Sequence, residues 1–310
     1  MTMDKGDLDN MTKANVNESS SYLISDETDS RLDFGGLFSP RFSNIMPLYS
    51  STHGSTELYT ATRYGKRFVL KGLKEQYRSN PIYKMALTKE FEIGILLDHP
   101  SIRRTLGFEA VDGLGDVIIL EYIDGLTLDA LMKSEKLTSA SVRSIAKQIA
   151  DGLDYIHTKQ VFHRDLKPSN ILISHQGLIV KIIDFNLSDS NEFIVLKNPA
   201  GSRKYMAPEQ LTPDAKPSAA SDIYSFGVVT RELAEAVRDD NLADIAAKCS
   251  NPDPNKRPQS LSVIKLPSVQ SSALRAVSGF LASKVLTYIM ICVCLALAAL
   301  ISYLLINPHN

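Results

Sequence analysis

The order of hydrophobic and polar positions divides the chain into a strand-rich first part and a helical second part. Short runs of alternating or β-branched residues predict strands at 57–61, 67–72, 105–110, 116–122, 171–174 and 179–183. Helical spacing is present at 81–97 and 128–157, and helical character continues from 209 to 261. Strands followed by helices indicate an α+β fold with a small sheet-rich lobe and a larger helical lobe.

Two polar stretches depart from this pattern. Residues 1–43 are rich in Ser, Asp, Asn and Thr and have no sustained period. They predict a disordered N-terminal tail, with a short docking element at 32–38. Residues 266–284 are rich in Ser and small residues, and they predict a flexible linker.

The last apolar run predicts a membrane span. Residues 286–306 contain no charged side chain, and twenty-one helical residues at about 1.5 Å each fit a hydrocarbon core of ~30 Å. We therefore expect one transmembrane helix at 285–306, followed by a short tail at 307–310. Basic residues precede the run and none follows it, which predicts that the folded part lies on the cytoplasmic side. The alternative is a buried core helix.

Composition narrows the class of protein. A chain of 310 residues with 44% hydrophobic content can bury a substantial core. Its 34 basic and 35 acidic residues nearly cancel, so nucleic acid is not expected as a partner. The three cysteines, Cys249, Cys292 and Cys294, have neither disulfide-framework nor zinc-site spacing. The folded part is therefore expected in a reducing compartment.

One short segment concentrates acid, amine and amide side chains. Asp165 is followed two residues later by Lys167 and three residues after that by Asn170. Asp184 comes fourteen residues further on. Phosphoryl transfer requires a carboxylate near the incoming hydroxyl, cations near the phosphates and oxygen ligands for Mg²⁺. Each residue taken singly would be an ordinary solvated loop residue, but the set together favours a phosphotransferase.

The same segment resembles a known family. His163-Arg164-Asp165-Leu166-Lys167-Pro168-Ser169-Asn170, with Asp184-Phe185-Asn186, is similar to the catalytic and metal-binding loops of eukaryotic-type (Hanks-type) serine/threonine protein kinases. The resemblance covers about residues 46–265 and implies a two-lobed protein-kinase-like fold over 44–265, with ATP between the lobes. It implies that Asp165 and Lys167 are catalytic. Asn170 and Asp184 would hold Mg²⁺, with Mn²⁺ as an alternative.

The resemblance also implies an ATP site. Lys71 matches the strand lysine that binds the α- and β-phosphates. Glu90, nineteen residues later on the predicted helix, matches its paired carboxylate, and Glu92 is the alternative. The other residues at which the resemblance implies ATP contacts are Ser51, Gly54, Val69, Glu121, Ile123 and Leu172.

The chain departs from the family pattern in two places. Kinases normally carry Gly-x-Gly-x-x-Gly over the phosphates, because glycine lets backbone N–H groups approach them closely. Here Ser51, His53 and Thr56 occupy those positions, and Gly54 is displaced by one. Asn186 also stands where the family usually has glycine. These departures favour a rival interpretation, a catalytically weak pseudokinase or ATP-binding signalling scaffold.

Further landmarks distinguish between classes of kinase. Ala207-Pro208-Glu209, Asp222 and Arg257 match structural positions of protein kinases, in which the glutamate pairs with the arginine. The stretch from Asp222 to Arg257 is short, where the family usually has an additional helix. This short stretch and the predicted membrane span favour a second rival interpretation, a small-molecule or lipid kinase. Lys167 and Gly201-Ser202 follow the serine/threonine pattern. The resemblance thus implies protein substrates with Ser or Thr hydroxyls and autophosphorylation in trans, whereas the apolar run at 286–306 predicts a single-pass membrane protein.

Overall fold

The computed structural model describes residues 40–50, 54–134, 137–184, 200–212, 216, 218–264 and 266. They belong to the first of the two units into which the chain divides, 1–267 and 268–310. The predicted docking element at 32–38, membrane helix at 285–306 and tail at 307–310 lie outside the described residues. So do nearly all residues of the predicted N-terminal tail and linker. Within the described part, no helix is both long and apolar enough to cross a membrane.

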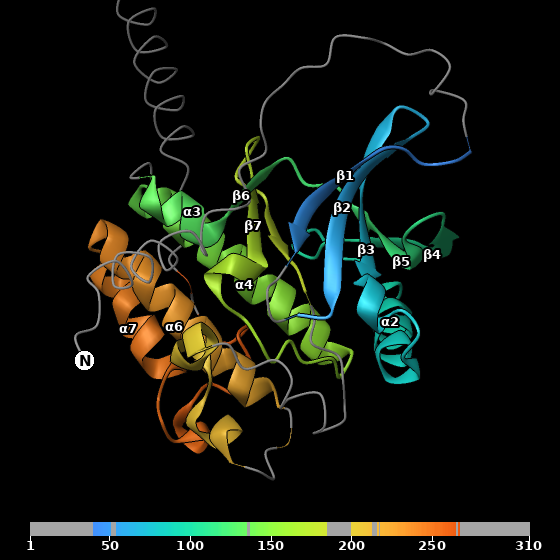
Figure 1. Cartoon of the computed structure of the whole chain (residues 1–310). Helices are drawn as coiled ribbons and strands as arrows, with labels where there is room; N and C mark the ends of the chain where they lie inside the picture. Colours follow the sequence, from blue (N-terminus) through green and yellow to red (C-terminus); the bar gives the residue numbers. More distant parts are fainter. Residues whose placement is uncertain are drawn as a thin grey trace, which may run out of the picture. The chain divides into compact units, whose positions relative to one another are not determined.

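Five antiparallel strands form the main sheet, in the spatial order β1-β2-β3-β5-β4 (Figure 1). Their bounds are β1 Ser43–Ser50, β2 Thr56–Arg63, β3 Lys66–Leu73, β4 Thr105–Val111 and β5 Gly115–Glu121. The predictions of β2 to β5 are confirmed. In the turn between β2 and β3, Tyr64 and Gly65 both have positive φ, 51° and 68°, as a tight two-residue hairpin turn requires.

Successive side chains of β3 supply two separate apolar clusters, because neighbouring residues of a strand point to opposite faces. Leu70 faces the cluster on one side of the sheet. Val69 faces the other side, where helix α2 (Pro81–Gly94) contributes the buried Leu87. α2 begins where the spacing predicts but ends at Gly94, a poor helix former, rather than at residue 97.

β1 is the strand of this sheet that the sequence pattern does not indicate. It begins at Ser43, the last residue of the predicted disordered tail, so that prediction is wrong at its C-terminal end. None of the eight residues of β1 is buried, since the strand lies at the edge of the sheet. Pro47 lies within it, which an edge strand tolerates. No run of core residues therefore marks β1 in the sequence.

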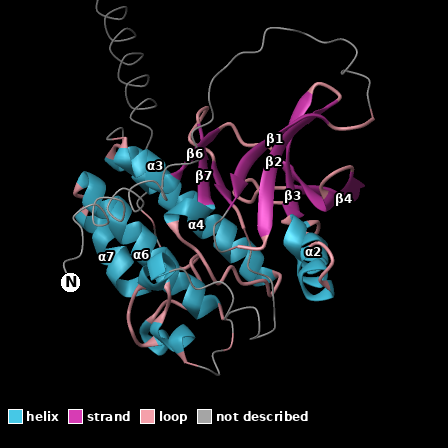
Figure 2. Cartoon of the chain, viewed as in Figure 1, coloured by secondary structure: helices cyan, strands magenta, loops and turns pink. Residues whose placement is uncertain are grey.

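The described part of the helical lobe combines helices with a small sheet of order β6-β7-β8, and Figure 2 shows β6 and β7 beside α3 and α4. The strands are β6 Gly125–Thr127, β7 Ile171–Ser174 and β8 Val180–Ile182. The helices are α3 Leu128–Lys133, α4 Ser139–Thr158, α6 Ala219–Val237 and α7 Asp240–Cys249. Short 3₁₀ turns occupy η1 Glu75–Tyr77, η2 Pro168–Asn170, η4 Ala200–Tyr205, η5 Pro208–Leu211 and η6 Pro254–Lys256.

The helical pattern over 128–157 is confirmed, and it belongs to two helices, α3 and α4. Thr138 begins α4 with a capping box: its Oγ1 accepts a hydrogen bond from the Ser141 backbone N–H (3.2 Å). In return, the Ser141 hydroxyl oxygen accepts one from the Thr138 backbone N–H (2.8 Å). These two hydrogen bonds pair backbone N–H groups that have no partner within the helix at its first turn, so a new helix begins here. Eight residues of α4 are then buried at helical spacing, from Val142 to Ile156.

α6 passes to α7 through two residues, Arg238 and Asp239. Arg238 takes a left-handed conformation (φ 55°), and Asp239 is the N-cap of α7. Arg143 of α4 holds this junction, donating to both carboxylate oxygens of Asp239 at 2.6 and 3.1 Å. Gly227 lets the helices approach closely, because a Cβ there would meet the Ser250 nitrogen at 2.6 Å. Among the described residues 218–264, the additional helix of other kinases is absent, as the short spacing predicts.

Candidate active site

The loop that precedes β7 brings three of the predicted residues together. Lys167 Nζ lies 2.8 Å from Asp165 Oδ2, and Asn170 Nδ2 donates to the backbone oxygen of Asp165 (2.8 Å) and to its Oδ2 (3.2 Å). Asn170 ends the 3₁₀ turn η2, which Pro168 begins, and the buried Ile171 follows directly. The sequence thus folds so that a tight turn presents Lys167 and Asn170 to one carboxylate.

The buried side chain of Asp222 in α6 holds the backbone of this loop in place. Its carboxylate, 1% exposed, accepts hydrogen bonds from the backbone N–H groups of His163 and Arg164, both at 2.8 Å. Arg164 has a φ of 67°, a conformation that costs free energy outside glycine and that these bonds hold in place. Asp222 therefore occupies a structural position, as the resemblance implies, and holds the backbone of the loop in place. His157 Nε2 also donates to this carboxylate (2.9 Å), a contact that the sequence analysis missed.

The side chain of His163 connects the loop to the second acid. Its Nε2 donates to the backbone oxygen of Ile183 (3.0 Å), and its Nδ1 accepts from the Asp165 backbone N–H (3.3 Å). Ile183 directly precedes Asp184, whose φ is 63°. A buried histidine with both ring nitrogens bonded therefore links the backbone of Asp165 to the backbone of the residue before Asp184.

Lys71 of β3 bridges two carboxylates. Its Nζ lies 2.6 Å from Glu90 Oε1 of α2 and also pairs with Asp184. The structure thus confirms Glu90 rather than Glu92 as the partner of Lys71. Lys71 is buried, and burial by itself would lower its pKa, but the carboxylates of Asp184 and Glu90 raise the pKa above its ordinary value. The amine is therefore held charged between residues from the two lobes.

The remaining predicted ATP contacts come from both sheets. Val69 of β3 and Leu172 of β7 are buried, and Glu121 ends β5, with Ile123 following two residues later. Gly54 precedes β2, whereas Ser51 and Asn186 lie outside the described residues.

Glu121 also takes part in a bridge between the sheets. Its Oε2 accepts from Lys181 Nζ of β8 (3.0 Å) and from the Arg104 backbone N–H (3.1 Å). Sequence reasoning missed this bridge, because nothing in the spacing connects a residue at the end of β5 with one in β8.

The comparisons with known proteins agree with this geometry. A family model described as protein kinase domain matches residues 50–238, more than half of the chain. The chain belongs to the protein kinase family. Its match lies within the predicted kinase region at 44–265, and the fold is the two-lobed protein kinase fold, with the β1–β5 sheet and α2 in the small lobe.

Curated relatives of this kinase domain are protein kinases, some of them named as serine/threonine kinases. CBL-interacting serine/threonine-protein kinase 8 of Arabidopsis thaliana is 39% identical over 147 residues, which are 46% of this chain and 32% of that protein. Calcium-dependent protein kinase 4 of Plasmodium berghei is 29% identical over 199 residues, which are 62% of this chain and 37% of that protein. The chain thus spans about a third of the length of these relatives.

A solved structure shows the same fold. The kinase domain of PknI from Mycobacterium tuberculosis is 21% identical and has a TM-score of 0.54, covering 71% of this chain and 93% of that chain. At this identity the likeness supports the fold, and the function has to be inferred from the site.

The kinase site offers oxygen donors for a divalent cation. The amide nitrogen of Asn170 is used on Asp165, so its Oδ1 is the atom suited to a metal, together with the carboxylate of Asp184. Among the described residues, no three His, Cys, Asp or Glu side chains group into a metal site of their own. Mg²⁺ usually takes one or two carboxylates and completes its shell with water and phosphate oxygens. The residues therefore fit the cation that the kinase family implies.

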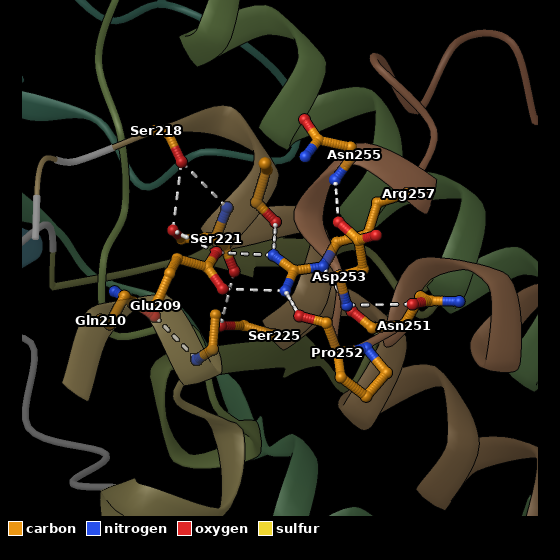
Figure 3. A network of polar contacts seen from close by, with 12 residues as sticks. Glu209, Gln210, Ser218, Ser221, Ser225, Asn251, Pro252, Asp253, Asn255 and Arg257 are labelled. Atoms are coloured by element: carbon orange, nitrogen blue, oxygen red, sulfur yellow. Dashed lines mark hydrogen bonds and ion pairs between the residues drawn. The ribbon is translucent and has the colours of Figure 1, made fainter. Parts of the chain in front are cut away.

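Figure 3 shows the polar network that holds the segment after the active site in this kinase. Arg257 donates to both carboxylate oxygens of Glu209, at 2.6 and 2.8 Å, which confirms the predicted pair. It also donates to the backbone oxygens of Asn251, Pro252 and Ala220, at 2.7, 3.1 and 2.9 Å. The hydroxyl of Ser221 donates to Glu209 (3.0 Å) from the first turn of α6. The network thus connects η5, α6 and the loop that carries η6.

Proposed function

We propose that this kinase domain transfers the γ-phosphoryl group of ATP to Ser and Thr hydroxyls of proteins. The observation that carries the proposal is Lys71 held between Glu90 and Asp184, which couples the nucleotide-binding strand to the helix and to the predicted metal ligand. A charged amine in that position suits the α- and β-phosphates of ATP. The relatives named as serine/threonine kinases support the choice of acceptor.

The residues of the loop then have distinct roles. Asp165 orients the substrate hydroxyl and accepts its proton late in the transfer. Lys167, 2.8 Å from that carboxylate, is placed to neutralise charge on the γ-phosphate as it moves. Asn170 and Asp184 would hold Mg²⁺, or Mn²⁺ in its place, and the cation supplies charge neutralisation at the phosphates when bound.

The rival functions explain less of the structure. A pseudokinase scaffold has no need of Asp165, Lys167 and Asn170 joined by mutual hydrogen bonds. A small-molecule or lipid kinase has no need of the network between Glu209 and Arg257, which supports the segment that presents protein substrates in this family. Incubation of the full chain with labelled ATP and Mg²⁺ distinguishes the three, when a generic protein, a phosphoinositide vesicle and choline are offered as acceptors. If label appears only in the lipid or only in choline, the protein is a lipid or small-molecule kinase and our proposal is wrong.

Replacing Lys71 should weaken nucleotide use without unfolding the domain. We expect Lys71→Met to raise KM for ATP by about ten- to a hundredfold, because a charge-assisted hydrogen bond is worth roughly 1.5–3 kcal/mol. Steady-state kinetics against ATP concentration measure this. Lys66→Met is the matched control, since Lys66 begins the same strand and is exposed. An equal change of the KM for ATP in both variants would show that Lys71 does not bind ATP.

We further propose that the run at 285–306 tethers the kinase to a membrane as a single-pass helix, with the catalytic domain in the cytoplasm. The support is the uncharged sequence from 286 to 306 and the basic residues before it. Replacing Leu297 and Leu300 by Arg should move the protein from the membrane to the soluble fraction, because each Arg at the centre costs about 2.5–3.5 kcal/mol. Carbonate-washed membranes measure the partition. Leu274→Arg with Leu281→Arg is the matched control, and release by that pair as well would contradict the assignment.

A further inference from the structure

Glu232 of α6 is an acid whose charge the chain itself compensates. Its side chain is 16% exposed, and its two carboxylate oxygens accept hydrogen bonds from the Tyr205 hydroxyl at 3.0 and 3.2 Å. The ammonium group of Lys204 pairs with the same carboxylate and lies 5.6 Å from the centre of the Tyr205 ring, within the range of a cation–π contact. Glu232 is therefore neutralised before any cation from a ligand could reach it.

The other charges near this pair leave a positive balance. Burial and the carboxylates of Glu232 and Asp129 raise the pKa of Tyr205, which places Asp129 of α3 close to this group. Asp129 is itself paired with Lys133, one turn along α3, at 3.9 Å. Arg203 is exposed, and none of the residues that the structure describes forms an ion pair with it. Each acid is thus matched by a lysine, and Arg203 adds a cation that is open to solvent.

α6 holds the segment that carries these cations beside the catalytic loop. Asp222 anchors that loop, and Ser225, three residues later on the helix, donates from its hydroxyl to the backbone oxygen of Tyr205 (2.8 Å). Residues three apart in a helix lie on one face, about 5–6 Å from each other. One face of α6 therefore carries both the loop of Asp165 and the segment of Lys204.

Gln210 makes a second connection between the two segments. Its side-chain amide accepts from the Ala207 backbone N–H (2.9 Å) and donates to the backbone oxygen of Arg164 (3.4 Å). Arg164 directly precedes Asp165, and Lys204 is three residues from Ala207. An extended peptide spans about 3.3 Å per residue. Residues of a substrate that lie a few positions from a hydroxyl bound at Asp165 therefore reach the cations of this segment.

We propose that the site selects protein substrates with Asp or Glu within about four residues of the acceptor Ser or Thr. Arg203 supplies the exposed cation for the substrate carboxylate. Lys204 is the specificity-determining residue, because it compensates the Glu232 carboxylate, which would otherwise attract Arg or Lys of a peptide. This inference rests on the proposed kinase function, since it names the substrates of the same site.

Peptide binding to the full chain tests the selection independently of catalysis. Two fluorescent peptides carry Ala in place of the acceptor residue and differ only in the residues on either side of it, which are Glu in one and Arg in the other. We expect fluorescence anisotropy to show that the acidic peptide binds at least about fivefold more tightly, the effect of one or two partly screened ion pairs.

Variants of the cationic segment should change this preference. Arg203→Glu combined with Lys204→Glu should reverse it, because two carboxylates then replace two cations. Lys204→Ala should bind the basic peptide at least about threefold more tightly than the unmodified protein does, since Glu232 is then open to it. An unfolded variant could not show this gain. Lys204→Arg should retain the acidic preference. Lys248→Glu, at an exposed lysine of α7, is the matched control and should leave both affinities unchanged.

The other outcomes overturn the proposal. Equal affinities, tighter binding of the basic peptide, or no binding of either would show that the unmodified protein does not select acidic residues. An unchanged preference in Arg203→Glu with Lys204→Glu, or an equal change in Lys248→Glu, would show that this segment is not the determinant. The same peptides with Ser at the acceptor position, offered with labelled ATP and Mg²⁺, separate this inference from the kinase function. Selective binding without transfer would contradict the kinase function alone, and transfer with equal kcat/KM to both peptides would contradict the selection alone.

Discussion

Asp165→Asn is expected to lower phosphoryl transfer at least a hundredfold while the fold and ATP binding persist. Asparagine preserves the size of the side chain and an oxygen that can accept the hydrogen bonds of Lys167 and Asn170. It removes the carboxylate that accepts the proton of the substrate hydroxyl, and a positioned general base contributes about 10²–10⁴-fold. Transfer of label from γ-labelled ATP to protein Ser and Thr measures the loss, and a nucleotide-binding assay checks the site.

The matched control for this prediction is Asp151→Asn. Asp151 is half exposed on α4 and pairs with Lys147, so its loss changes a surface carboxylate without touching the loop. Full activity in Asp165→Asn would place the catalytic base elsewhere. No transfer by the unmodified protein under conditions where it binds ATP would favour the signalling scaffold, and the departures from the glycine pattern at 51–56 and 186 would then be its cause.

The sequence predicts the local part of this site and misses its long-range part. Asp165, Lys167 and Asn170 lie within six residues, so one turn brings them together once β7 is placed. The Lys71–Glu90 pair could also be predicted, because the family resemblance fixes both the strand and the helix that carry them.

The missed contacts join segments that no spacing relates. His157 and Asp222 are 65 residues apart, and Lys181 lies 60 residues from Glu121. In the sequence, each of these four residues is an ordinary polar position. His157 and Asp222 meet because α4 packs on α6, and Lys181 and Glu121 meet because β8 of the small sheet lies near β5 of the main sheet. β1 escapes prediction for a related reason, since an edge strand without buried residues leaves no apolar pattern.

The largest effect on stability is expected from Arg257→Ala. The Arg257 side chain is fully buried and bonded to Glu209 and to three backbone oxygens. Its removal leaves the partly buried carboxylate of Glu209 with only the Ser221 hydroxyl as a side-chain donor, and it takes the guanidinium donor from those backbone oxygens. Breaking a buried ion pair in this way typically costs about 3–5 kcal/mol. Urea unfolding followed by circular dichroism should show the loss as a lower midpoint at unchanged slope.

Lys256→Ala is the control, because Lys256 is the neighbouring residue and its side chain is 70% exposed. Its ion pair with Asp253 is long, with 3.7 Å between the Lys256 Nζ and Asp253 Oδ2 atoms. It should change stability by less than about 0.5 kcal/mol. Similar losses in both variants would mean that the η6 loop, rather than the buried pair, sets the stability.

The pH dependence gives a separate check on the same pair. Burial by itself would raise the pKa of Glu209, but hydrogen bonds from Arg257, from its own backbone N–H and from Ser221 lower the pKa below its ordinary value of 4.5. A carboxyl whose pKa is lower in the folded than in the unfolded protein stabilises the fold above the unfolded pKa, and that stabilisation fades as the pH falls towards the folded pKa. The difference in unfolding free energy between the unmodified protein and Glu209→Gln should therefore shrink below about pH 4.5. A difference that stays constant across this range would show that the carboxylate charge contributes nothing to the network and that Arg257 acts through the backbone oxygens.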